Sequence, residues 1–323
     1  MSVGREATAP ETRVARLLTT SELAQALGVS ESSIKRWVDD GTIRGARTAG
    51  GHRRIAITEA LRFIRATRAP LADPELLGVP EVAAAGSDRH TAGGPDERLL
   101  AYLERGEAVR ATGLLLALFL GGERIADLAD GPLRAAMARL GELWRERPDG
   151  IFVEHRATAI CIEAVSRLRT LLPNNDGAPA AVGGAPAGDP YALPTLCAAA
   201  VLAEVGFRST NLGPDTPFDT LEHAAVATGA QLVWVAVTVR PRDRHFERDL
   251  VDLGSRLGKA GATLAVGGRG IEGRRRPAHP PYRRQTTMAS LAELGNALMR
   301  RHLTRTGGVP TLLRDLNGNT FSD

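Results

Sequence analysis

The residues with the clearest chemical meaning lie near the N-terminus, where hydroxyl and basic side chains share one face of a predicted helix. In residues 30–38 the apolar positions fall on the opposite face, so the polar face is expected to point to solvent. Small hydroxyl and basic side chains suit hydrogen bonds to base edges and phosphates in the major groove of DNA. We therefore predict a DNA recognition helix, with contacts made by Ser32, Ser33, Lys35 and Arg36.

A basic hairpin is predicted directly after this helix, because two adjacent glycines lie among cations between two short candidate strands. Such a hairpin, called here the wing, can press cations against the phosphate backbone or reach the minor groove, which gives salt-dependent affinity. We expect that replacing Arg53 and Arg54 together weakens DNA binding and reduces its salt dependence. The predicted DNA contacts in and before the wing are Arg44, Arg47, Thr48, Gly50, Gly51, His52, Arg53 and Arg54.

Helix signals place these two elements in one compact module over residues 17–68. Thr19 and Glu22 have the spacing of a capping box, and Gly28 can end the first helix in a tight turn. Ser30 can cap the second helix. A helix, a turn, a second helix and a basic hairpin in this order predict a winged helix-turn-helix domain.

A second group of candidate residues lies further along the chain. Trp144 precedes a PDG turn, after which Glu154 and His155 open a new helix; taken alone, this pattern fits a packed corner or a ligand site. Other candidates follow predicted strands, and the loops at the carboxyl ends of parallel strands are where such sheets bind ligands. These candidates are Asp189, Tyr191, Thr238, Gly267 and Gly268.

The periodicity around these candidates predicts a multidomain chain, α-rich with an α/β part. Helical periodicity over 99–173, broken at glycines and prolines, predicts a four-helix bundle. Apolar runs alternate with helical stretches over 178–304, which predicts a flavodoxin-like, doubly wound parallel sheet. Its strands are expected at 180–184, 208–213, 231–239 and 262–268. The remaining segments are expected to be a disordered arm (1–16), a Pro- and Gly-rich linker (69–98) and a tail (305–323).

Composition narrows the class of protein. The 323 residues are 43% hydrophobic and 24% charged, which favours two or three globular domains over a disordered or membrane chain. No apolar run approaches the ~18 residues of a spanning helix, and the first residues lack the apolar core of a secretion signal, so we expect a cytoplasmic protein without a membrane partner. The net charge of +4 permits a nucleic-acid partner. Cys161 and Cys197 have no metal-binding spacing and are predicted to be buried free thiols, and no metal site is expected.

Residues 17–68, with the wing run RTAGGHRR, resemble the MerR-type winged helix-turn-helix in the branch close to excisionases. The remaining chain resembles the cobalamin-binding regulators of the CarH and LitR type, through Trp144 followed after nine residues by Glu154-His155, and through Gly267-Gly268. In that family a bundle caps the upper face of the corrin, and the sheet domain holds the lower face and the nucleotide tail. The resemblance implies a regulator that binds a double-stranded DNA operator as a dimer or tetramer, with adenosylcobalamin or methylcobalamin as cofactor.

This resemblance fails at the metal ligands. Such modules carry Asp-x-His-x-x-Gly after the first strand, where the histidine ligates cobalt and the acid orients it. Here Asp189 is retained, but Tyr191 stands in the histidine position and Pro194 in the glycine position, and a neutral phenol is a poor cobalt ligand compared with imidazole. The serine-x-leucine element keeps one hydroxyl, at Thr238, and Arg145 stands where light-sensing members have a second histidine. Light switching through two histidine ligands is therefore not expected.

Three alternatives stay open for the C-terminal half. It binds cobalamin without the usual histidine; it binds another ligand, for which Arg145, Arg147 and Arg156 favour an anion; or it has lost its pocket and serves oligomerisation. The leading prediction is a transcriptional regulator, specifically a repressor, whose sensory half controls oligomeric state and operator affinity. A DNA-bound anchor for a protein partner and a corrinoid-dependent enzyme component are the rivals, and residues 1–98 offer no substrate-activating domain for an enzyme. Three roles also stay open for the basic loop 269–276: it contacts DNA, it binds phosphate, or it is a solvated loop without a ligand.

Overall fold

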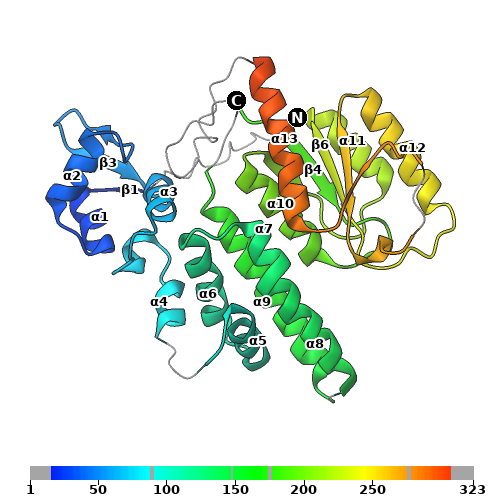
Figure 1. Cartoon of the computed structure of the whole chain (residues 1–323), viewed down its shortest axis with the longest axis horizontal. Helices are drawn as coiled ribbons and strands as arrows, with labels where there is room; N and C mark the ends of the chain where they lie inside the picture. Colours follow the sequence, from blue (N-terminus) through cyan, green and yellow to red (C-terminus); the bar gives the residue numbers. More distant parts are fainter. Residues whose placement is uncertain (1–15, 88–90, 147, 174–176, 275–277, 307–323) are drawn as a thin grey trace, which may run out of the picture.

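The structure, a computed structural model, describes residues 16–87, 91–146, 148–173, 177–274 and 278–306. An N-terminal module lies at one end of the long axis and a sheet domain at the other, with a helical bundle between them (Figure 1). This confirms the predicted multidomain fold with an α-rich and an α/β part. The predicted arm lies outside the described residues except for Arg16, and the predicted tail does so from residue 307 onward.

The N-terminal module has the predicted order of helix, turn, helix and hairpin. Its elements are β1 (Leu17–Leu18), α1 (Thr20–Leu27), α2 (Glu31–Asp39), β2 (Ala46–Arg47), β3 (Arg53–Ala56) and α3 (Ile57–Thr67), with antiparallel strands in the order β1-β3-β2. The capping box forms: the Thr19 amide donates to Glu22 Oε2 at 2.8 Å, and the Glu22 amide donates to Thr19 Oγ1 at 3.1 Å. Gly28 ends α1 with a φ of 66°. Trp37 of α2 packs on Phe63 of α3, with 5.1 Å between the ring centroids, which fixes the position of α2.

The bundle also follows the prediction. Four helices of the described chain build it: α5 (Pro95–Arg105), α6 (Ala108–Leu120), α8 (Arg134–Glu146) and α9 (Gly150–Thr170). Between α6 and α8 the chain passes through α7 (Ile125–Leu128) and a π-helical turn (Ala129–Leu133), where Gly131 has non-helical φ and ψ. The breaks therefore fall at the glycines and prolines that the sequence places there.

The segment 69–98, predicted to be a linker, contains helical elements in the structure. A 3-10 turn, η1 (Pro74–Leu77), and the short helix α4 (Glu81–Gly86) precede α5. Helix α4 lies directly against α6, because a Cβ built at Gly113 would lie 1.9 Å from the carbonyl oxygen of Glu81. A helix this short owes its stability to packing rather than to its own propensity. For that reason its local pattern gave no helix signal.

Within the described residues the C-terminal domain is a five-stranded parallel sheet in the order β5-β4-β6-β7-β8. Its strands are β4 (Ala180–Gly184), β5 (Arg208–Asn211), β6 (Leu232–Ala236), β7 (Thr263–Gly267) and β8 (Arg283–Gln285). Its helices are α10 (Ala192–Val205), α11 (Phe218–Thr228), α12 (Phe246–Lys259) and α13 (Met288–Thr306). This is the flavodoxin strand order, in which the connections reverse direction between β4 and β6. Apolar clusters on both faces bury the sheet, with α11 and α12 on one side and α10 and α13 on the other (Figure 1).

Two details of this sheet differ from the prediction. Strand β6 ends at Ala236 rather than at residue 239, because the amides of Thr238 and Val239 turn away to donate to Asp189. The edge strand β8 was not predicted, since its three residues, Arg283–Gln285, form no apolar run. Both differences arise from contacts between loops and strands that are distant in sequence.

Polar contacts join the three parts of the molecule. Arg65 of α3 pairs with Glu204 of α10 at 2.7 Å and donates from Nε to the carbonyl oxygen of Phe119 at 3.0 Å. Its guanidinium carbon lies 3.8 Å above the Phe119 ring. Glu204 also accepts from the amide of Ile125 at 2.7 Å, and both members of the pair are mostly buried. One arginine therefore contacts the N-terminal module, the bundle and the sheet domain together.

The bundle and the sheet domain share a second polar contact. Asp130, in the π-helical turn, accepts from the amides of Met288 and Ala289 at 2.9 Å each. The carboxylate thereby caps the start of α13, where a negative charge is favoured by the free amides and the helix dipole. The same residue forms an ion pair with Arg134.

Cys161 and Cys197 are buried and free, as predicted. Burial raises the pKa of each thiol to about 12, from an ordinary value of 9.0. We expect neither thiol to react with a charged disulfide reagent at pH 8, and both to react once the chain is unfolded in guanidinium. Because the raised pKa favours the protonated folded state, this contribution to stability is complete below pH 9 and falls as the pH rises toward 12. Rapid labelling of the folded protein at pH 8 would contradict the burial.

No helix among the described residues is long and apolar enough to cross a membrane.

Candidate functional site

The predicted recognition face of α2 is open to solvent. Ser32, Lys35 and Arg36 are exposed, and Ser33 is half-buried. The hydroxyl of the N-cap residue Ser30 lies 2.9 Å from the hydroxyls of both Ser32 and Ser33, so three hydroxyls gather at the start of the helix. Lys35 pairs with Glu31 of the same helix at 3.1 Å. The guanidinium of Arg36 forms no hydrogen bond or ion pair within the described residues, so it is available to a base or a phosphate.

The predicted wing forms between β2 and β3. The Thr48 amide donates to the carbonyl oxygen of His52 at 2.9 Å, and the Gly51 amide donates to that of Thr48 at 2.8 Å. Gly51 has a φ of 76°, a conformation that side chains disfavour, which explains a glycine at the tip. Arg47, Thr48, Gly50 and His52 are exposed at or beside this tip.

Asp39, at the end of α2, holds the wing, and sequence reasoning missed this role. Its carboxylate accepts from Arg53 Nε at 3.0 Å and from Arg53 Nη2 at 2.7 Å, and it also accepts from Arg47 at 2.9 Å. The hydrogen bonds from Arg53 hold the pKa of this carboxyl below its ordinary value of 3.8. The signal that could have revealed it is the pair of acids, Asp39 and Asp40, at the end of the recognition helix and shortly before the arginines of the wing.

We call the Asp39 carboxylate with Arg53 and Arg47 the clamp. It changes the roles of two predicted contacts. Arg53 is mostly buried against Asp39, so it positions the wing rather than reaching freely for phosphate. Arg54 is half-buried, with Nη1 donating to the carbonyl oxygen of Arg53 at 3.1 Å. Arg44 remains exposed, with its amide held by Glu59 at 2.9 Å.

We expect Asp39→Ala to reduce discrimination between specific and random DNA by about threefold, because the solvent-screened hydrogen bonds from Arg53 and Arg47 that fix the wing are lost. Affinity for random DNA should rise, since one negative charge near the phosphates is lost. Fluorescence anisotropy with both DNAs at two salt concentrations measures the ratio of the two dissociation constants. Asp40→Ala is the matched control, because Asp40 bonds Thr42 rather than a wing arginine. An equal loss of discrimination in the control would show that the clamp is not the cause.

The clamp should also persist over a wide pH range. Because the pKa of Asp39 is lowered in the folded state, the stability it contributes is present above the ordinary value of 3.8. That stability is lost only as the pH falls below this value. DNA discrimination that depends on Asp39 should therefore not change between neutral pH and pH 5.

The candidates on the sheet domain meet at the carboxyl ends of β4, β6 and β7. Asp189 is buried, 2% exposed, and its Oδ2 accepts from the amides of Thr238 and Val239 at 2.5 and 3.0 Å. Its Oδ1 accepts from the amide of Tyr191 at 3.2 Å. Both carboxylate oxygens therefore bind the backbone of the loops that follow β4 and β6. The acid ties these two loops together at the point where the sheet reverses direction.

The glycine pair after β7 serves the packing of loops. A Cβ built at Gly268 would lie 2.2 Å from the carbonyl oxygen of Val237, and Gly268 has a φ of 109°. A Cβ at Gly267 would lie 2.9 Å from the carbonyl oxygen of Gln285. The close approach that these glycines permit is to neighbouring backbone of the same domain.

Tyr191 is 39% exposed and lies before α10. The guanidinium of Arg269 stands 5.8 Å from the centre of its ring, and Arg269 Nε donates to the carbonyl oxygen of Thr238 at 3.4 Å. The phenol ring thus has a cation beside it, in an environment that does not favour a second cation such as a metal ion. Among the described residues, no group of three or more His, Cys, Asp or Glu side chains could hold a metal ion.

Trp234 occupies the space between the sheet and α10, and sequence reasoning did not assign it a role. It is 2% exposed, its indole Nε1 donates to Thr195 Oγ1 at 2.9 Å, and a Cβ at Gly183 would lie 2.2 Å from its ring. A cavity of about 100 Å³ remains beside it, between the ends of β6 and β7 and helices α10 and α13. An engineered cavity of about 150 Å³ accommodates benzene, so this space is smaller than a single benzene site.

The bundle candidates lie on α8 and α9. Trp144 belongs to α8, but its side chain lies outside what the structure describes, as do those of Arg145 and Arg147. Glu154 and His155 approach each other to 3.6 Å, His155 is largely exposed, and Glu154 accepts from Thr158 at 3.0 Å. Within the described residues, no hydrogen bond or ion pair joins Glu154 or His155 to the loops of the sheet domain.

Comparison with known families gives two matches, one in the N-terminal module and one in the bundle. Residues 17–68 match the family described as helix-turn-helix domain, and residues 96–169 match the family described as B12 binding domain. The chain joins a helix-turn-helix domain to a B12 binding domain. This order is consistent with the regulator architecture that the sequence resembles. No curated protein matches the chain.

Solved structures similar to the chain include three whose descriptions name a corrinoid or cobalamin. The monomethylamine corrinoid protein of Methanosarcina barkeri is 16% identical with a TM-score of 0.46, over 64% of this chain and 98% of that chain. The methanol:cobalamin methyltransferase complex MtaBC of the same organism is 16% identical with a TM-score of 0.32, over 64% and 80%. A cobalamin-binding protein of Desulfitobacterium hafniense is 15% identical with a TM-score of 0.30, over 61% and 94%.

The residues of the sheet domain do not fit a cobalamin whose nucleotide tail enters the sheet. The space beside Trp234 is smaller than a benzene site, and a benzimidazole nucleotide is larger than benzene. Asp189 has no histidine to orient, because its oxygens bind backbone amides. In the bundle, which contains the residues matched to the B12 binding domain family, Ile151, Phe152 and His155 are exposed near the start of α9.

Proposed function

We propose that this protein is a transcriptional regulator that binds a short DNA operator through α2 and the wing. The observation that carries the proposal is the exposed polar face of α2, with the unpaired guanidinium of Arg36, beside a wing that Asp39 fixes in position. A recognition helix enters the major groove while a basic hairpin contacts the backbone, and each needs a defined position relative to the other. The clamp provides that position before DNA binds.

We propose further that the protein binds repeated half-sites as a dimer or tetramer. One module of this size reads one half-site, and repetition of half-sites gives the affinity that a single module lacks. Repression is the proposed direction of control, because occupation of an operator is sufficient to block transcription without any added contact. The C-terminal half is proposed to act as the module that senses a small molecule or sets the oligomeric state.

The DNA-binding proposal is tested by selecting DNA from a random library with the full-length protein. We expect a short, repeated motif, and we expect Arg36→Ala to weaken binding to it by about tenfold or more, since a specific side-chain contact to a base is worth about 1–3 kcal/mol. Lys259→Ala is the control, an exposed cation on α12 that lies far from α2 (Figure 1). Absence of any enriched motif, or an equal loss in the control, would refute the proposal.

The sensory half is tested with adenosylcobalamin and methylcobalamin in darkness and light. Because Tyr191 replaces the histidine and Trp234 fills the adjacent space, we expect no spectrum of histidine-ligated cobalt and no change of oligomeric state on illumination. Absorption spectra and size-exclusion chromatography measure both. A corrinoid that co-elutes with a histidine-ligated spectrum would overturn this part.

A further inference from the structure

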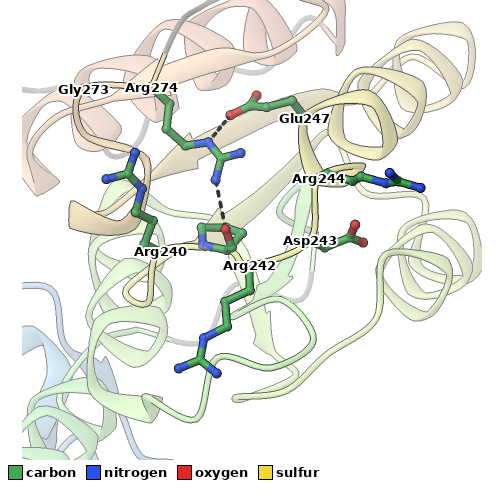
Figure 2. Close-up of a pocket in the computed structure, with 8 residues that line it drawn as sticks. Arg240, Arg242, Asp243, Arg244, Glu247, Gly273 and Arg274 are labelled. Atoms are coloured by element: carbon green, nitrogen blue, oxygen red, sulfur yellow. Dashed lines mark hydrogen bonds and ion pairs between the residues drawn. The ribbon is translucent and has the colours of Figure 1, made fainter.

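A cavity of about 430 Å³ lies at the carboxyl ends of β6 and β7, where Gly273 and Arg274 of the basic loop 269–276 form part of its lining. Two loops form it: the loop that follows β6 and the loop that follows β7. Figure 2 shows the side chains around it, among them Arg240, Arg242, Arg244 and Arg274. We call it the arginine cavity. The loops at this edge of a parallel sheet are where such domains bind ligands.

Glycines bring the two loops of the arginine cavity together. A Cβ at Gly270 would lie 2.4 Å from the carbonyl oxygen of Val239, and the Gly270 amide donates to the carbonyl oxygen of Val237 at 2.9 Å. Gly268 approaches the carbonyl oxygen of Val237 in the same way. Gly268 and Gly270 are therefore two positions where the contact between the loops requires glycine. Cations that lie more than 25 residues apart in sequence are placed at one edge as a result.

Arg274 forms the fixed wall of the cavity. Its Nε pairs with Glu247 Oε1 at 2.8 Å, its Nη1 donates to the carbonyl oxygen of Pro241 at 3.3 Å, and its side chain is 18% exposed (Figure 2). These contacts lie on either side of the guanidinium and hold its plane in place. Glu247 thereby balances the charge of Arg274.

The charge of the other cations is not balanced. Arg240 and Arg242 form no hydrogen bond or ion pair within the described residues, and Arg244 contacts only the ring of its neighbour His245, at 3.1 Å. Asp243, the second acid at the cavity, accepts from the His245 amide at 2.8 Å. With four arginines and two acids lining it, the cavity is net positive.

We propose that the arginine cavity binds a small anion that carries phosphate. Guanidinium groups match the oxygens of phosphate with paired hydrogen bonds, and a cavity of ~300–1,000 Å³ is typical of small-molecule sites. The proposal deepens the proposed function, on which it rests, by naming the class of effector that the sensory half would detect. Helix α12, beside the cavity, lies at the opposite end of the molecule from α2 (Figure 1).

The experiment uses the full-length protein with inorganic pyrophosphate as the probe, titrated by calorimetry at constant ionic strength. We expect binding by the native protein and a dissociation constant at least tenfold larger for the double variant R240Q/R242Q. R248Q is the matched control, because Arg248 is an exposed cation of α12 that pairs with Asp249. It should bind pyrophosphate like the native protein. Arg240 and Arg242 are exposed, and their side chains have no hydrogen-bond or ion-pair partner in the part of the chain that the structure describes, so we expect both variants to fold.

A second arm separates the two sources of phosphate, with binding of the selected DNA measured for the same variants. We expect DNA affinity within twofold of the native value in all of them. No binding of pyrophosphate, or equal binding by R240Q/R242Q, overturns the inference. Weaker DNA binding by R240Q/R242Q, matched to its loss of pyrophosphate, would assign the cavity to nucleic acid and also overturn it. Pyrophosphate binding by a protein that selects no DNA motif would instead refute the proposed function and leave the cavity intact.

Discussion

Trp234→Ala should lower the free energy of unfolding of the sheet domain by about 3–5 kcal/mol, the usual cost of truncating a buried aromatic side chain. The indole is 2% exposed, it packs against Gly183 where no side chain fits, and its Nε1 is bonded to Thr195. The variant loses the packing of the ring and leaves the Thr195 hydroxyl without this partner. Urea denaturation followed by far-ultraviolet circular dichroism measures the loss.

The new cavity provides a second measurement. Free benzimidazole should raise the urea midpoint of Trp234→Ala, because a ligand that binds only the folded state stabilises it. It should leave the native protein unchanged, since the indole already fills that space. Trp234→Phe serves as the control: it keeps a ring, so its loss of stability should be smaller. A midpoint of the Ala variant equal to that of the native protein would show that Trp234 does not fill a structural space.

Arg65→Ala should release the helix-turn-helix domain from the rest of the molecule. Arg65 pairs with Glu204 at 2.7 Å, donates to two carbonyl oxygens and lies over the Phe119 ring. Breaking a fully buried pair costs about 3–5 kcal/mol; because this pair keeps some exposure, we expect about 1–3 kcal/mol. Amide hydrogen exchange should then show faster exchange at the contact between α3 and α6, with protection inside each domain retained.

Arg62→Ala is the matched control for this experiment. Arg62 lies one turn earlier on α3, and its partner Glu59 belongs to the same domain. Its loss should leave the contact between domains intact. Glu204→Gln, alone and combined with Arg65→Ala, gives the coupling energy of the pair from a double-mutant cycle. If the two variants have strictly additive effects, the pair does not couple the domains.

The ion pair between Arg65 and Glu204 also connects the C-terminal half to the helix-turn-helix domain, which matters for regulation. A ligand or oligomer contact that shifts α10 would act on Glu204, and through it on the helix that follows the wing. The two states of such a switch must differ in at least one contact, and the prediction is that the Arg65–Glu204 pair is that contact. Under the proposed function, operator affinity in Arg65→Ala should therefore no longer respond to a ligand of the C-terminal half.

The sequence by itself determined the elements whose signals are local. The capping box at Thr19 and Glu22, the turn at Gly28 and the glycine-rich wing follow from hydrogen bonds within a few residues, so the helix-turn-helix domain is readable without its tertiary structure. The apolar run of β6 likewise indicated a central strand, because burial on both faces leaves a continuous hydrophobic signature. The prediction that Tyr191 stands where the resemblance implies a histidine also comes from the sequence alone.

The tertiary structure decided which side chains meet. Asp39 reaches Arg53 only because the hairpin folds back on α2, and Arg65 reaches Glu204 only because three domains pack together. Helix α4 has too few residues to show a pattern, and its place depends on the missing side chain of Gly113. The arginine cavity arises where glycines let two loops touch. Contacts between distant segments leave no periodic pattern in a sequence, so the position of the wing, the packing of the domains and the arginine cavity could be found only in the tertiary structure.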